Sequence, residues 1–336
     1  MHGLTARNDG SVEMMSVGPT LPWHKLGVLL PDIATGKEAM KAAQLDWKVK
    51  KTEMMHNGEH FQNHYFVERM DNGKAIGICG KEHALFQNED LFEFMDEVTM
   101  DPNGPKYVTA GSLKGGQRVW MLAKLPQWSE IVPKDRVDHY LLLSRGFYYE
   151  SIRMMWTSVR VVCNNTLTMA LQNFAGDNLK YRFSHRGDLS THAIKAQDAL
   201  GFMTEKVRAF EVFGQGLAQI EPSEEQVMLT LDQLFNPGGA EKDTRTRKNA
   251  DAKIQKVITL AQTGMGAEMV SGTGWGWFNA VTEYVDHHYS AEMALKTKHN
   301  PDEYRFDLLL SGGGNELKTR ASELFGQMIP KELLTV

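Results

Sequence analysis

The sequence predicts an α+β fold, with an antiparallel sheet of hairpins and packed helices in the N-terminal half and a mainly helical C-terminal half. Up to about residue 162, short runs rich in β-branched and aromatic residues alternate with turns that contain glycine and asparagine. Beyond residue 189, apolar residues recur at helical spacing instead. We place the boundary between two predicted domains, 1–186 and 187–336, at this change of period.

Hairpins dominate the first half of the sequence. Asn57-Gly58 and Asp71-Asn72-Gly73 separate three strand-forming runs, and asparagine and glycine tolerate the positive φ angles of tight hairpin turns. A further hairpin is expected around Gly115-Gly116. The expected strands are 45–55, 60–70, 74–80, 107–113, 117–125, 137–144 and 151–162.

One helix interrupts these strands and several follow them. From Asn88 to Met100, apolar residues recur at i, i+3, i+4 and i+7, which predicts a helix with one buried face. Asn164 and Asn165 are expected to cap a helix over 166–173, because short amide side chains accept hydrogen bonds from the amides of a first turn. The expected later helices are 190–217, 223–235, 249–262, 276–289 and 315–328.

Composition excludes several classes of protein. The 336 residues include 37 lysines and arginines against 42 aspartates and glutamates, and the formal net charge of -5 excludes a surface that is basic throughout. Cys79 and Cys163 form no C-x-x-C pair, and Cys163 is interpreted as a small buried residue of a structural motif. No apolar run reaches the ~18 residues of a membrane span, and no signal peptide is evident, so we expect a cytoplasmic protein in its host cell.

The most informative stretch runs from Arg145 to Arg186. It holds six cations and two anions, a local charge of 6 minus 2, or +4, together with seven aromatic residues. Cations that neutralise phosphates and rings that stack on bases are what a groove for single-stranded nucleic acid requires, although a basic sheet edge with core aromatics has the same composition. The residues predicted to bind nucleic acid are Arg145, Tyr148, Tyr149, Arg153, Trp156, Arg160, Lys180, Arg182 and Arg186.

Two of these arginines have opposite parity along the same predicted strand. Arg153 and Arg160 would point to opposite faces of a regular strand, so both line one groove only if a bulge intervenes. Arg160 shares its expected face with Trp156, and its charge needs a partner if that face is buried.

Two alternatives remain open. Glu283 and His287 share a helix face at i, i+4 near Asp286, so a metal-dependent enzyme acting on nucleotides or nucleic acid is one. A packed helix with solvated polar neighbours explains these residues equally well, and we expect no metal and no cofactor. A protein that binds a host factor through its acidic surface is the second alternative.

Several motifs resemble one family. Residues 157–167, T-S-V-R-V-V-C-N-N-T-L, resemble the R-V-V-C-x-N-T-L signature of the phage/plasmid-like proteins grouped as domain of unknown function 932. Residues 22–27, P-W-H-K-L-G, and the T-E-Y-V-D-H run that ends at His287 are similar to two further motifs of that family. Many relatives have a His-Asp-Gly turn where this chain has Ser144-Arg145-Gly146, so a role of that pair does not transfer.

The resemblance implies a functional context. The phage and plasmid setting of that family is similar to the setting of single-strand annealing proteins, which combine a strand-and-helix core, a basic groove and assemblies of identical subunits. The leading hypothesis is therefore a homo-oligomer that binds single-stranded DNA and supports annealing or recombination without chemical catalysis.

Overall fold

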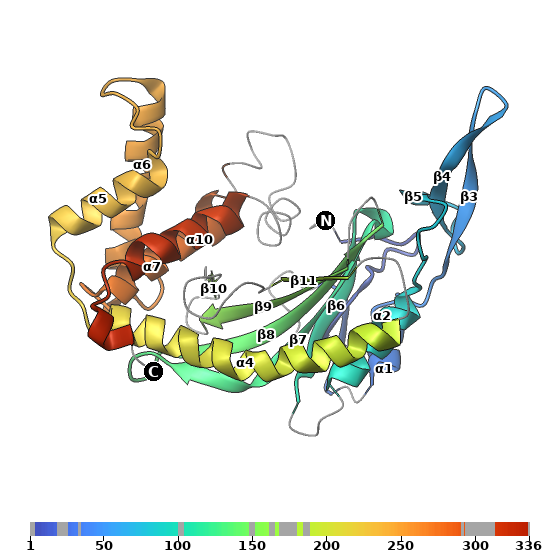
Figure 1. Cartoon of the computed structure of the whole chain (residues 1–336), viewed down its shortest axis with the longest axis horizontal. Helices are drawn as coiled ribbons and strands as arrows, with labels where there is room; N and C mark the ends of the chain where they lie inside the picture. Colours follow the sequence, from blue (N-terminus) through green and yellow to red (C-terminus); the bar gives the residue numbers. More distant parts are fainter. Residues whose placement is uncertain are drawn as a thin grey trace. The chain divides into compact units, whose positions relative to one another are not determined.

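A computed structural model describes residues 4–18, 26–32, 35–99, 104–147, 152–160, 165–167, 180–183, 189–289, 292 and 313–334. The chain divides into two compact units, shown together in Figure 1. Unit 1 comprises Met1–Pro126, Tyr140–Trp156 and Asn178–Met203, and unit 2 comprises Gln127–His139, Thr157–Asp177 and Thr204–Val336. The predicted domain boundary near residue 186 lies outside the described residues and stays a prediction.

Strands concentrate in the N-terminal half and helices in the C-terminal half, so the predicted mixture of α and β structure is confirmed at this level. The strands are β1 Met14–Val17, β2 Val28–Leu30, β3 Val49–His56, β4 Glu59–Arg69, β5 Ala75–Gly80, β6 Lys106–Leu113, β7 Arg118–Glu130, β8 Arg136–Gly146, β9 Ile152–Arg160, β10 Asn165–Leu167 and β11 Lys180–Phe183. The helices are α1 Gly36–Ala42, α2 Asn88–Thr99, α4 Leu189–Ala218, α5 Glu224–Phe235, α6 Arg245–Thr263, α7 Gly274–Glu283 and α10 Gly313–Gly326, and a π-helix covers Tyr284–Tyr289.

The strands form two sheets. The larger sheet has the order β10-β9-β8-β7-β6-β1-β2, and β11 also pairs with β9. The smaller sheet, β3-β4-β5, is antiparallel throughout. Its first turn contains Asn57 and Gly58 at φ angles of 51° and 83°, as the asparagine-glycine pair predicts. The β3–β4 hairpin extends as an arm, on which Met55 and Phe61 are about half exposed (Figure 1).

The core of unit 1 contains residues of both sheets and of two helices. Helices α1 and α2 contact each other, and the predicted apolar face of α2 is buried in one cluster with residues of β6, β7 and β8. Trp47, which precedes β3, packs against Phe147 with ring centroids 5.9 Å apart. This packing places the end of β8 inside the core.

Unit 2 is built around aromatic residues of α7. Trp275 and Phe278 are fully buried, and Phe278 makes edge contacts with Phe213 of α4 and Phe325 of α10. A capping box begins α5, because Ser223 and Gln226 exchange hydrogen bonds with each other's backbone. Among the described residues, no helix is sufficiently long and apolar to cross a membrane.

The predicted helix start after Asn164 is wrong for residues 165–167. Asn165 lies opposite Arg160 in an antiparallel ladder, so these residues form strand β10 instead. The backbone groups of residues 165–167 form hydrogen bonds with β9. The capping preference of asparagine reflects only neighbouring residues, so it cannot predict this pairing between separate strands. Residues 168–173, the rest of that predicted helix, lie outside the described residues. Strands β1, β2 and β11 and helix α1 were not predicted.

Candidate nucleic-acid interface

Strands β9 and β11 bring several predicted cationic residues together. Arg182 lies directly opposite Arg153 in the antiparallel ladder, and Lys180 lies opposite Met155. Between them, Tyr181 lies opposite Met154, and Phe183 lies opposite Ile152. Opposite positions of an antiparallel pair share a face, and successive positions alternate between faces.

This register separates basic positions from apolar ones. The side chains of Ile152 and Met154 are buried in the core cluster of unit 1. Positions 153, 180 and 182 therefore belong to the opposite face of the sheet. The sequence Lys-Tyr-Arg-Phe of β11 has the period-2 pattern that fits this arrangement, and the signal is visible in the sequence alone.

Two predicted residues do not belong to this surface. Arg145 is 1% exposed and Trp156 is 5% exposed, so the predicted contacts of Arg145 with phosphates and of Trp156 with bases on an open surface are corrected. Arg145 has the same parity along β8 as the core residues Leu141 and Leu143, and Trp156 has the parity of Met154 along β9. Both side chains consequently follow their strands' core faces.

The other predicted residues are described in part or not at all. For Arg153, Arg160, Asn165, Lys180 and Arg182 the backbone is described, and their side chains lie outside the description. Tyr148, Tyr149, Cys163, Asn164 and Arg186 lie outside the described residues altogether. Along β9, position 160 falls on the same face as Trp156 and Ser158, as regular strand alternation predicts. Both of these side chains are buried.

The buried guanidinium of Arg145 has an unusual environment. It lies over the ring of Phe147, 4.0 Å from the ring centroid. None of its three nitrogens has a hydrogen-bond partner among the residues that the structure describes. Burial lowers the pKa of Arg145 to about 9, while the charge of Asp90 acts in the opposite direction. The side chain is therefore still a cation at neutral pH.

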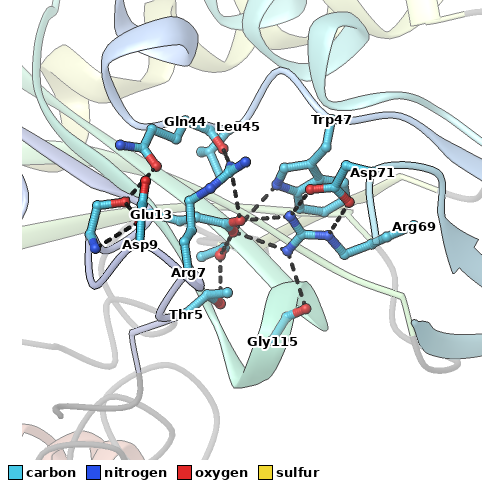
Figure 2. A network of polar contacts seen from close by, with 12 residues as sticks. Thr5, Arg7, Asp9, Glu13, Gln44, Leu45, Trp47, Arg69, Asp71 and Gly115 are labelled. Atoms are coloured by element: carbon cyan, nitrogen blue, oxygen red, sulfur yellow. Dashed lines mark hydrogen bonds and ion pairs between the residues drawn. The ribbon is translucent and has the colours of Figure 1, made fainter. Parts of the chain in front are cut away.

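A second buried arginine, Arg69, lies in a network of polar contacts (Figure 2). Its Nη2 donates to Glu13 Oε1 at 2.6 Å and to Asp71 Oδ2 at 2.7 Å, and its Nε donates to Asp71 Oδ1 at 3.0 Å. Its Nη1 donates to Glu13 Oε2 at 3.2 Å and to the Gly115 carbonyl at 3.3 Å. The guanidinium also lies 4.0 Å from the Trp47 ring centroid. Every nitrogen of this cation is thus engaged.

The electrostatics of this network agree with its geometry. Burial by itself lowers the pKa of Arg69, but hydrogen bonds and charge from Asp71 and Glu13 raise that pKa overall. Burial raises the pKa of Asp71, and the hydrogen bonds and charge of Arg69 more than reverse this, so the pKa of Asp71 is lowered. Because Arg69 ends β4 and Glu13 precedes β1, the network links the smaller sheet to the larger one within unit 1.

A polar cleft of about 350 Å³ adjoins the network. It is lined by Arg7, Arg69 and Lys74 and by the carboxylates of Asp9, Glu13 and Asp71, among others. Cations and anions are balanced in this lining, so it shows no preference for an anionic or a cationic ligand. The sequence carries no signal for this network, because Glu13 and Arg69 are 56 positions apart and belong to no motif.

Unit 2 contains a buried histidine between two serines. His139 on β8 is fully buried; Ser129 Oγ lies 2.8 Å from its Nε2 and Ser158 Oγ lies 2.7 Å from its Nδ1. In a neutral imidazole one nitrogen donates and the other accepts, so each serine hydroxyl can complement one of them. Burial lowers the pKa of His139 to about 4, and the charge of Asp138 opposes this shift.

The residues of the enzyme alternative lie at the end of α7 and in the π-helix. Glu283 is buried, and the carboxylate of Asp286 is 2.8 Å from the ammonium nitrogen of Lys318, with both side chains fully buried. Asp286 is therefore engaged in an ion pair. In the described part of the chain, no group of three or more histidine, cysteine, aspartate or glutamate side chains is arranged to hold a metal ion.

These features define a mixed α/β protein whose larger sheet carries a basic strand pair, β9 and β11. A family model described as "Domain of unknown function (DUF932)" matches residues 75–310, well over half of the 336 residues, and the chain belongs to this family. The matched span contains Arg145 and the segment 152–183, whereas Glu13 and Arg69 precede it. Comparison with curated proteins and with solved structures gave no match.

Proposed function

We propose that this protein binds single-stranded DNA as an assembly of identical subunits and supports annealing or recombination in a phage or plasmid. The β9–β11 ladder is the interface in this proposal. Arg153, Lys180 and Arg182 contact the phosphates of the DNA, while Arg145 and Trp156 serve inside the fold.

The register of the ladder is the observation that carries the proposal. Arg153 and Arg182 are 29 positions apart in the sequence, yet they lie opposite each other. Like charges placed directly opposite each other destabilise an antiparallel pair, so a polyanion that neutralises both positions would be stabilising there. Their separation from the apolar positions 152 and 154 supports a solvent-facing role, and the net charge of -5 makes a local cationic surface necessary for any DNA contact.

The test is a salt titration of DNA binding. Fluorescence anisotropy with a labelled single-stranded oligonucleotide measures Kd at several salt concentrations, because each neutralised phosphate releases counterions from the strand. We expect Kd of the wild-type protein to rise steeply with salt. The triple variant Arg153→Gln, Lys180→Gln and Arg182→Gln removes three contacts, so the slope of log K against log salt should become shallower by about 2.

A matched control removes cations elsewhere. Lys242, Arg245 and Lys248 are exposed at and before the start of α6, and their glutamine variants change the net charge by the same amount. This control should retain the wild-type slope. Absence of binding, a Kd that does not change with salt, or equal losses in both triple variants would each refute the ladder as the interface.

A further inference from the structure

Two buried arginines in unit 1 differ in one respect. Both Arg69 and Arg145 are about 1% exposed, and both guanidinium groups lie 4.0 Å from an aromatic ring centroid. Arg69 donates hydrogen bonds from all three nitrogens and forms ion pairs with Glu13 and Asp71. Arg145 makes no hydrogen bond and no ion pair with any described residue. A cation buried in this way is strongly unfavourable unless something compensates it.

The compensation required is an anion with oxygen acceptors. A buried water molecule satisfies hydrogen bonds but leaves the positive charge unbalanced. The charge of Asp90 acts on Arg145, but the Asp90 carboxylate accepts no hydrogen bond from its guanidinium nitrogens. Arg145 is the penultimate residue of β8 and so lies at the end of this strand. A guanidinium presents a planar fork of donors that matches the oxygens of a phosphate group.

We propose that Arg145 forms a small oxyanion-binding site at the end of β8, with a phosphate group as its ligand. This site lies on the core face of the larger sheet, whereas the ladder positions 153, 180 and 182 belong to the other face. It is therefore separate from the proposed DNA interface and does not rest on the proposed function. The phosphate group is either a free ion or part of an ester such as a nucleotide.

The experiment is thermal unfolding of the full chain at constant ionic strength, with sodium chloride replaced stepwise by sodium phosphate. A ligand that binds only the folded state raises Tm in proportion to the logarithm of its concentration once it exceeds Kd. We expect the Tm of the wild-type protein to rise by several degrees. The variant Arg145→Met keeps the length and apolar stem of the side chain without its charge, so phosphate should no longer raise its Tm.

A second comparison needs no ligand. In chloride alone, Arg145→Met should unfold at the wild-type temperature or above it, because it removes an uncompensated buried charge. Arg136→Met is the matched control, since Arg136 also stacks on a ring, that of Trp128 at 4.9 Å, but its side chain is 47% exposed. That control should keep the wild-type response to phosphate.

Three results would overturn the proposal. One is a wild-type Tm that phosphate does not change, and another is an equal rise in Arg145→Met. The third is a large loss of Tm in Arg145→Met in both buffers, because that result means that the chain itself supplies the partner. A nucleoside monophosphate, compared with its nucleoside and with inorganic phosphate, identifies the source: a larger rise than with inorganic phosphate indicates an ester, and an equal rise indicates the free ion. Loss of DNA binding by the ladder variants would leave these results unchanged.

Discussion

Acidification should destabilise the protein through His139. Its pKa is 6.5 in an exposed chain and about 4 in the fold, where burial disfavours the charged ring. Above pH 6.5 the ring is neutral in both the folded and the unfolded state, so its titration does not change the free energy of unfolding. As the pH falls from 6.5 to about 4, the unfolded state takes up a proton that the folded state excludes. The difference, 6.5 minus about 4, at 1.36 kcal/mol per pH unit, corresponds to a loss of about 3 kcal/mol.

The assay is urea denaturation followed by tryptophan fluorescence at several pH values between 7 and 4. His139→Gln retains a donor and an acceptor beside Ser129 and Ser158 but does not titrate. The wild-type free energy of unfolding should fall by about 3 kcal/mol more than that of this variant over the range. His56→Gln, at an exposed hairpin turn, should follow the wild-type curve. Parallel curves for wild type and His139→Gln would refute the reasoning.

Two further predictions concern packing in unit 1. Arg69→Met leaves the buried carboxylate of Glu13 without its ion-pair partner, so it should lower the free energy of unfolding by about 3–5 kcal/mol. In urea denaturation, the double variant with Glu13→Gln should lose less than the sum of the two single losses. Additive losses would contradict the coupling between the two residues. Gly77→Ala should cost at least about 1–3 kcal/mol, because an added Cβ would clash with the backbone carbonyl oxygen of Phe147. Gly238→Ala, where nothing lies within 4 Å, is its control, and equal Tm values for the two variants would argue against this close contact.

Local sequence patterns correctly predicted the hairpin turns and the buried helix face, because these features depend on residues close together in the chain. The turns at Asn57-Gly58 and Gly73 fixed the smaller sheet, and the apolar spacing of residues 91, 92, 95 and 98 fixed the buried face of α2. The error at Asn165 has the opposite origin. Asparagine is a favourable helix cap in isolation, but its neighbours pair with β9, and that strand pairing outweighs the local preference.

The candidate site was only partly predictable. The burial of Arg145 follows from alternation along β8, where it shares parity with Leu141 and Leu143. The local excess of cations in the sequence gives no information on which face of the strand Arg145 lies. The absence of a partner for Arg145 among the described residues depends on tertiary packing and has no sequence signal. The sequence also gives no signal that Arg153 lies opposite Arg182 in the ladder. The register between strands far apart in the chain depends on the tertiary fold.

The two short strands beside β9 bear on how this chain can be divided for experiments. β11 pairs with the first part of β9 and β10 with its last part, while β8 is its neighbour on the main path of the sheet. A fragment that stops before residue 180 would leave the first half of β9 with unsatisfied main-chain donors and acceptors. Such a strand recruits other polypeptides and promotes insolubility. Truncations designed for expression should therefore extend through Phe183.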